Sequence, residues 1–114
     1  MTIEQWSDNI LVVEVQDDPA FTDDMSSLLD QIEQAPTFDV VLYLAAVSYL
    51  NSSNIAKLLK LRKKVVGNRR RLVLCGIDTD VWGLFLVTGL DKVFEFADSV
   101  ATGLGTVQLS AQDQ

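Results

Sequence analysis

Four consecutive small polar residues form the segment whose side chains and setting best suit a regulatory chemical step. They read Asn51-Ser52-Ser53-Asn54, and all four favour the N-cap of a helix. The start of a helix gathers unpaired amide donors and the positive end of the helix dipole, so a phosphate added to a serine there meets donors that already point at it. Two interpretations follow. One serine is a phosphoacceptor, or a serine only caps the helix, in which case its loss costs ~1 kcal/mol.

The rest of the sequence lacks the residues that common catalytic sites require. It has no histidine, which excludes imidazole acid–base chemistry and histidine metal ligation, and it has no Cys-x-x-Cys pair and no glycine-rich phosphate loop. Two carboxylate pairs, Asp17-Asp18 and Asp23-Asp24, fit the ordinary composition of a loop and a helix N-terminus. We therefore expect no enzyme, no cofactor and no metal, with an enzyme of unknown type as the remote alternative.

The polar segment lies between a predicted buried strand and a predicted amphipathic helix. Residues 40–44 form a continuous apolar run with β-branched side chains, which is typical of a strand covered on both faces. From residue 55 the apolar residues follow helical spacing and lysines occupy the opposite side, until Gly67-Asn68 ends the helix. The polar segment is therefore expected at the mouth of this helix.

The remaining elements alternate between strands and helices. The sequence predicts a hairpin of Ile3–Trp6 and Ile10–Val15, a helix from Phe21 to Ala35 capped by Asp18 or Thr22, a strand Leu72–Cys75, a helix from Asp78 or Thr79 to Thr88, a strand Val93–Phe96 and a last helical turn through Ala101. We expect one α/β domain over residues 1–104, with a mixed, mostly parallel β-sheet of four to five strands, an N-terminal hairpin and about four helices. Residues 105–114 are expected to form a flexible tail.

Charge is divided unevenly along this chain of 114 residues, whose net charge is -7. Ten of the sixteen acidic residues lie in positions 4–39, and eight of the nine basic residues lie in positions 57–71. The acidic balance argues against nucleic-acid binding, and the basic segment is interpreted as a solvated helix face or, alternatively, as a surface for an acidic partner. The lone Cys75, the lack of an apolar run of ~20 residues and the acidic N-terminus predict a cytoplasmic protein that is not inserted in a membrane.

The predicted third helix is apolar almost all round over residues 81–87, although a surface helix needs only one apolar stripe. Part of it, either Trp82 or Phe85, is therefore expected to be exposed and to contact a partner or a second copy in a homodimer. The alternative is that the whole helix is core, covered by a terminus.

Three segments of the chain resemble STAS domains, the fold of the anti-sigma-factor antagonists and of the cytoplasmic tails of sulfate transporters. Residues 47–54 read Val-Ser-Tyr-Leu-Asn-Ser-Ser-Asn, residues 71–76 read Arg-Leu-Val-Leu-Cys-Gly, and residues 88–94 read Thr-Gly-Leu-Asp-Lys-Val-Phe. The corresponding family patterns are Val-x-x-Leu-Asp-Ser-Ser-Gly, Arg-Leu-Val-Leu-x-Gly and Thr-Gly-Leu-Asp-x-x-Phe. The resemblance covers roughly half of the chain and implies the STAS fold.

The resemblance also implies a phosphorylation switch. In the family, the first serine of the loop is phosphorylated by a partner that is both anti-sigma factor and serine kinase, and this serine matches Ser52. The unphosphorylated antagonist binds the anti-sigma factor; the phosphorylated form is released until a metal-dependent PP2C-type phosphatase resets it. The chain thus resembles a bacterial anti-sigma-factor antagonist, and the alternative is an accessory STAS subunit of an ABC-type lipid transporter that docks on its ATPase.

The residues around Ser52 are expected to contact the partner, together with the exposed part of the third helix. These predicted partner-binding residues are Ser48, Tyr49, Asn51, Ser53, Asn54, Lys57, Trp82 and Phe85. The chain departs from the family pattern at Asn51, which replaces an aspartate, and at Asn54, which replaces a glycine. Gln16 and Pro19 stand where the antagonists have a glycine and an aspartate, so the partner contact of that aspartate is expected to be missing.

Overall fold

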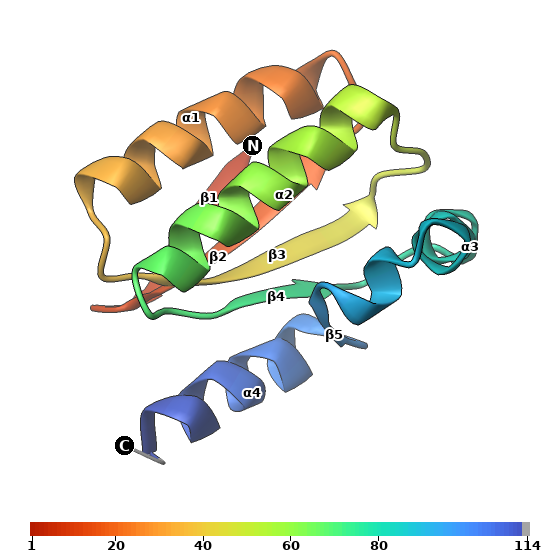
Figure 1. The fold of residues 1–114 in the computed structure, drawn as a ribbon. Helices are drawn as coiled ribbons and strands as arrows, with labels where there is room; N and C mark the ends of the chain where they lie inside the picture. Colours follow the sequence, from red (N-terminus) through yellow and green to blue (C-terminus); the bar gives the residue numbers. More distant parts are fainter. Residues whose placement is uncertain (113–114) are drawn as a thin grey trace.

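A twisted β-sheet carries helices on both faces, as the ribbon views show (Figure 1). The computed structural model describes residues 1–112, with side-chain burial described up to Leu109. Along the chain the elements are β1 (Thr2–Ser7), β2 (Ile10–Gln16), α1 (Ala20–Gln34), β3 (Asp39–Ala46), α2 (Ser52–Gly67), β4 (Leu72–Cys75), α3 (Thr79–Thr88), the short 3-10 helix η1 (Leu90–Lys92), β5 (Glu95–Ala97) and α4 (Val100–Gln112).

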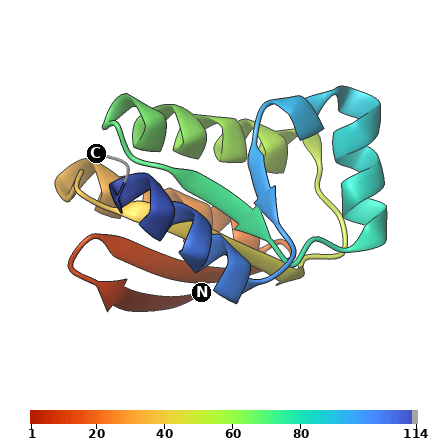
Figure 2. The same ribbon diagram turned by 90° about the horizontal axis from the view of Figure 1, so that it is seen from below.

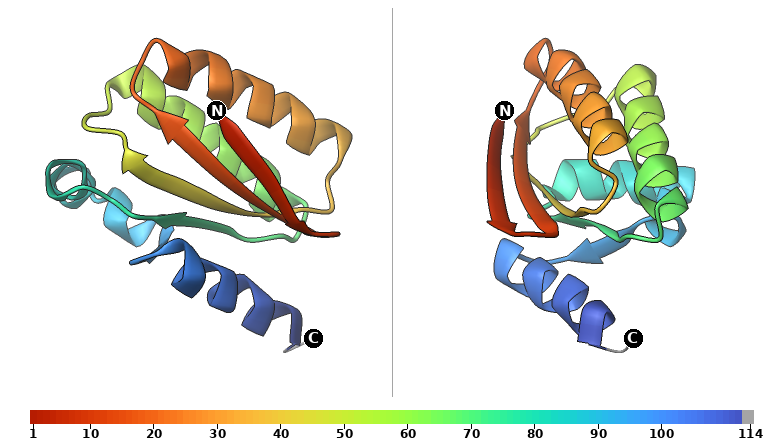
Figure 3. Two further views of the ribbon diagram at one scale, coloured as in Figure 1. Left: turned by 180° about the vertical axis from the view of Figure 1, so that it is seen from behind. Right: turned by 90° about the vertical axis from the view of Figure 1, so that its left-hand side faces the viewer.

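Within the described residues the sheet has five strands in the order β1-β2-β3-β4-β5. The hairpin pair β1–β2 is antiparallel, and every other pair is parallel. Parallel neighbours need a crossover, and right-handed crossovers in one direction place α1 and α2 on the same face of the sheet. Figure 3 shows these two helices side by side on one face, and Figure 2 shows α4 crossing the other.

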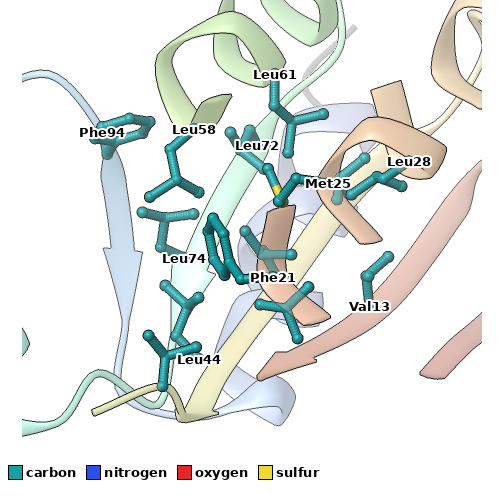
Figure 4. Packing of buried hydrophobic residues seen from close by; sticks show 14 of the residues in the cluster. Val13, Phe21, Met25, Leu28, Leu44, Leu58, Leu61, Leu72, Leu74 and Phe94 are labelled. Carbon is teal, nitrogen blue, oxygen red and sulfur yellow. The ribbon is translucent and has the colours of Figure 1, made fainter. Parts of the chain in front are cut away.

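Two hydrophobic clusters hold these layers together. The larger cluster lies under α1 and α2 and is drawn in Figure 4; Phe21 and Met25 from α1 and Leu58 and Leu61 from α2 are each at most 1% exposed. The smaller cluster lies between the sheet and α4 and includes the fully buried Val107. Both faces of β3 and β4 are therefore covered, which explains their continuous apolar sequences.

The predicted fold class is confirmed: one α/β domain, a mixed and mostly parallel sheet, an N-terminal hairpin and four α-helices in the described residues. The predicted alternative cap Asp78 is the N-cap of α3, where it accepts a hydrogen bond from the amide of Asp80 at 3.0 Å. The last strand begins two residues later than predicted, because Leu90–Lys92 forms a 3-10 turn after Gly89, whose φ is 75°.

The predicted end of the last helix is wrong. Instead of a single turn through Ala101 followed by a loose segment, α4 continues to Gln112, and residues 113–114 lie outside the described part of the chain. Packing explains the difference, because Val107 is fully buried against the sheet and Gly103 lies so close to Val41 that an added Cβ would meet its Cγ1 at 3.0 Å. Tertiary contact thus outweighs the low helix propensity of Gly103.

We expect Val107→Ala to lower the free energy of unfolding by about 2 kcal/mol, because it removes buried methyl groups and leaves a cavity. The matched control is Leu109→Ala on the same helix, whose side chain is 61% exposed and whose loss should change stability by less than about 0.5 kcal/mol. Urea denaturation measures both. Equal stability of Val107→Ala and the wild type would contradict the docking of α4 on the sheet.

Candidate phosphoacceptor and protein-docking site

The predicted site lies at the carboxyl ends of the parallel strands, where two loops meet. One loop joins β2 to α1 and contains Asp17 and Asp18; the other joins β3 to α2 and contains residues 47–51. Three hydrogen bonds link the two loops, and a fourth joins Asp18 to Asn54 in the first turn of α2. Loops at this edge of a parallel sheet commonly form the binding surface of α/β proteins.

Asn51 is the N-cap of α2 and forms a reciprocal capping box with Asn54. Its Oδ1 accepts the backbone N–H of Asn54 at 2.8 Å, and Oδ1 of Asn54 accepts the backbone N–H of Asn51 at 3.1 Å. The extended backbone at Asn51, with ψ of 176°, turns the chain from the loop into the helix. The start of α2 is therefore held by Asn51 and Asn54, without a contribution from the side chains of Ser52 and Ser53.

Ser52 and Ser53 are the first two residues of α2, and both are exposed. Among the described residues, neither hydroxyl has a hydrogen-bond partner. The interpretation in which a serine only caps the helix is therefore wrong, because the cap is Asn51. A hydroxyl at this position lies next to first-turn amides that have no partner within the helix.

Asp18 connects the starts of α1 and α2. Its Oδ1 accepts hydrogen bonds from the backbone N–H and the Oγ1–H of Thr22 at 2.8 and 2.6 Å. Its Oδ2 accepts from Nδ2 of Asn54 at 2.8 Å and, more weakly, from Nδ2 of Asn51 at 3.4 Å. These donors stabilise the carboxylate and lower the pKa of Asp18, with the Thr22 hydroxyl contributing most. Neither predicted cap of α1 is correct, because the N-cap position is Pro19, which makes no side-chain cap hydrogen bond. Asp18 lies one residue before it and binds the first turn of α1 through the backbone N–H of Thr22.

Asp17 fixes the second loop in the same manner. Its two carboxylate oxygens accept the backbone N–H of Ser48 at 2.8 Å and the hydroxyl of Ser48 at 2.6 Å. The hydroxyl contact is the main cause of the lowered pKa of Asp17. We call the contacts of Asp17 and Asp18 with Ser48, Asn51 and Asn54 the loop clamp.

The contacts of Asp17 and Asp18 with the second loop were not predicted from the sequence, which indicated ordinary loop composition for this pair and a possible helix cap for Asp18. Their partners in the other loop lie 31 to 36 positions further along the chain, so no local pattern reports the contact. A signal was nevertheless present in the sequence. Two carboxylates that can accept hydrogen bonds lie in one loop, and the hydroxyl and amide donors Ser48, Asn51 and Asn54 lie in another segment predicted at the same edge of the sheet.

The other predicted partner-binding residues are not equally accessible. Tyr49 is 53% exposed beside the clamp, and Lys57 is half-buried with its Nζ donating to Oγ of Ser26 at 3.3 Å. Asn54 is only 1% exposed, because its side chain is used by the cap and by Asp18. Its side chain is therefore a structural element and does not reach a partner.

On α3 the structure separates the two predicted alternatives. Trp82 is 36% exposed, whereas Phe85 is 1% exposed and packs edge-to-face on Phe94 and Phe96. The prediction that Phe85 contacts a partner is corrected: its ring is part of the aromatic core beneath α3. Trp82 packs edge-to-face on Phe96 at 5.0 Å, beside a surface cavity of about 290 Å³.

Three further observations concern the residues that the structure describes. They contain no group of three or more histidine, cysteine or acidic side chains that could hold a metal ion. None of their helices is both long enough and apolar enough to cross a lipid bilayer. The burial of Cys75 raises its pKa to about 11, which leaves the thiol protonated and unreactive near neutral pH.

Comparison with known proteins gives one family match. A family model described as the STAS domain matches residues 4–103. Among curated proteins, none matches the chain.

Several solved structures share the fold at low sequence identity. A serine-to-glutamate variant of RsbS from Moorella thermoacetica is 20% identical, covers 97% of each chain and gives a TM-score of 0.83. A putative anti-sigma factor antagonist from Thermotoga maritima is 13% identical, covers 94% of this chain and 93% of its own, and gives 0.82. The anti-sigma factor antagonist SpoIIAA in its unphosphorylated form is 15% identical, covers 94% and 95%, and gives 0.78. The phosphorylated form of SpoIIAA, a Bacillus cell fate determinant, is 14% identical, covers 93% and 97%, and gives 0.70.

Because Asn51 is the cap, we expect Asn51→Ala to lower the free energy of unfolding by about 1 kcal/mol. Ser52→Ala should change it by less than about 0.5 kcal/mol, because no hydrogen bond is lost. Chemical denaturation of the two variants tests the assignment. The reverse order of the two effects would show that Ser52 caps α2.

The loop clamp should make the protein acid-sensitive. Because the folded-state pKa values of Asp17 and Asp18 lie below the ordinary value of 3.8, the clamp contributes fully above about pH 4 and its contribution is lost as the pH falls through the lowered values. Asp18→Asn should therefore lower stability near neutral pH and make the loss of stability on acidification shallower. Thermal unfolding followed between about pH 7 and pH 3 measures this.

The control for net charge is Asp23→Asn, which removes a carboxylate from the same end of α1 without removing any side-chain hydrogen bond among the described residues. A wild-type acid dependence in Asp18→Asn would contradict the role of Asp18 in the clamp.

Proposed function

The chain belongs to the STAS domain family, and from this premise we propose that it is a protein-binding regulator, an anti-sigma-factor antagonist whose binding is switched by phosphorylation of Ser52. In this role the unphosphorylated chain binds an anti-sigma factor that is also a serine kinase. Phosphorylation releases that partner, and a PP2C-type phosphatase restores the binding form. The chain acts by occupying its partner and not by catalysis.

The observation that carries the proposal is the state of the Ser52 hydroxyl. Ser52 is exposed at the first position of α2, and its hydroxyl forms no hydrogen bond with any of the described residues. A kinase therefore reaches it without breaking a contact of the fold. Ser53 is also exposed, and it is the alternative acceptor at the same helix end.

The loop clamp explains how such a modification acts without refolding. The helix cap and the loop contacts are made by Asn51, Asn54 and Asp18, so a phosphate on Ser52 removes none of them. It adds about -1.5 to -2 charges and considerable bulk to the surface. A close-packed interface built over a small hydroxyl is then opposed by steric overlap and by the cost of desolvating the phosphate.

The structural neighbours support this proposal at the level of fold. SpoIIAA, described as an anti-sigma factor antagonist, has been solved in unphosphorylated and phosphorylated forms, and both resemble this chain over more than nine-tenths of its length. The same fold thus accommodates both states of that protein. For this chain, the exposed serine at the helix start supplies the corresponding acceptor.

Mass spectrometry of the protein isolated from its native host tests the modification. We expect a mass increase of one phosphate that disappears in Ser52→Ala and persists in Ser53→Ala. Disappearance in Ser53→Ala alone would reassign the acceptor, and a protein never phosphorylated under growth or stress conditions would contradict the switch.

Binding should follow the modification. We expect Ser52→Ala to retain the partner ATPase of the histidine-kinase type from host lysate, and Ser52→Asp to retain about tenfold less, because the added charge opposes docking. Equal retention by both variants would refute the switch. Retention of a transport ATPase by both would instead identify an accessory subunit of an ABC-type lipid transporter with a constant docking edge.

A further inference from the structure

The outward face of α2 is one continuous stripe that begins at Ser52. The exposed residues of this helix all fall within one sector of the helix circumference, opposite the buried Leu58, Leu61 and Val65. We call these exposed residues the α2 stripe: Ser52, Ser53, Ala56, Leu59, Lys60, Lys63, Val66 and Gly67. Figures 1 and 3 show α2 at the outer side of the helical layer, with α1 along one flank.

The lysines of α2 divide into two groups. Lys57 and Lys64 turn toward α1, where Lys57 contacts Ser26 and Lys64 forms an ion pair with Glu33 at 3.0 Å. Lys60 and Lys63 lie on the α2 stripe and are exposed, and neither forms an ion pair or hydrogen bond with any residue that the structure describes. The stripe itself carries no acidic residue; the acidic neighbour of Lys60 is Glu33 of α1, whose pKa is lowered mainly by Lys64 and also by the charge of Lys60.

Apolar side chains lie between these charges. Leu59 is 37% exposed and Val66 is 47% exposed, and Ala56 adds a small apolar surface between Ser52 and Lys63. A helix face that contacts only water is commonly made of polar and charged residues, and Leu59 and Val66 depart from that composition. The combination of two unpaired lysines with interleaved aliphatic side chains instead complements a surface that has both carboxylates and apolar groups.

We propose that the α2 stripe docks an acidic, partly apolar surface of the partner protein, such as a helix that presents glutamates and leucines on one face. This inference rests on the proposed docking role of the Ser52 end and adds the chemistry of the partner. Lys60 and Lys63 pair with partner carboxylates, while Leu59 and Val66 supply the apolar contact.

The position of Ser52 on the stripe gives the phosphate an electrostatic role. Ser52, Ala56, Leu59 and Lys63 follow one another at helical spacing along the same line of the helix surface. A phosphate at the head of that line places about two negative charges where an acidic partner approaches. Release then follows from like-charge repulsion as well as from bulk, and it weakens as salt screens the charges.

The flank of the stripe fixes the orientation of the partner. α1 runs beside α2 and exposes Asp30, which repels an acidic surface, whereas the charge of Glu33 is balanced by its ion pair with Lys64. The partner is therefore confined to the outer face of α2 and away from α1, which distinguishes this docking mode from a general attraction to the basic segment of the sequence.

An NMR titration tests the proposal with a defined probe, a helical peptide of about 18 residues made of Glu, Ala and Leu with one acidic and apolar face. At low salt we expect amide shifts in residues 52–67 on the exposed side of α2. We expect Lys60→Glu/Lys63→Glu to weaken binding about tenfold, and the control Arg69→Glu/Lys92→Glu, which changes the same number of exposed charges elsewhere, to change it less than about twofold. A peptide with Lys in place of Glu should not bind.

Shifts centred outside α2, or equal loss of binding in the two double variants, would overturn the proposal. Equal binding of phosphatidylserine vesicles to the same residues would also overturn it, in favour of a membrane surface. The titration uses the unphosphorylated protein, so its result is independent of the mass measurement at Ser52. The peptide could bind the α2 stripe although the protein is never phosphorylated in its host. That result would support the proposed docking chemistry and reject only the phosphorylation switch.

Discussion

A single carboxylate, Asp18, sets the geometry on which the site depends. It accepts hydrogen bonds from Thr22 at the start of α1 and from Asn54 and Asn51 at the start of α2. Hydrogen bonds to a charged acceptor are stronger than those between neutral groups, and four of them converge on one side chain. The two helices are thereby fixed relative to each other at the end where Ser52 is presented. Asp17 extends the same constraint to the preceding turn through Ser48.

This constraint separates the functional surface from the elements that hold it. Asn51, Asn54 and Asp18 form the support, while the side chain of Ser52 neither caps the helix nor forms a hydrogen bond among the described residues. The helix therefore presents a hydroxyl whose chemistry is free to change while the backbone beneath it stays in place. The α2 stripe continues this rigid surface along the helix. A change of charge at Ser52 therefore acts on a partner that is bound along the stripe.

Much of this was predictable from the sequence because the signals are local. The apolar run of residues 40–44 and the helical period after residue 55 define β3 and α2, and the polar segment between them identifies the site. Which of its four residues caps the helix was not predictable, because all four types favour that position and only the extended backbone at Asn51 decides it. The loop clamp was missed because its donors and acceptors are distant in the sequence. The burial of Phe85 and the length of α4 depend on aromatic and aliphatic neighbours from other elements, which periodicity does not reveal.

The reciprocal contacts of the loop clamp also bear on how this sequence diverges. Positions 18, 51 and 54 satisfy one another, with Asn54 using its oxygen for the cap and its amide for Asp18. A glycine at position 54 would leave one oxygen of Asp18 with only the 3.4 Å contact from Asn51, and an apolar residue at position 18 would leave a buried amide unpaired. Either substitution alone is therefore expected to lower the stability of the fold. The three positions are therefore expected to be inherited as a set, so that close relatives retain all three together or replace them together.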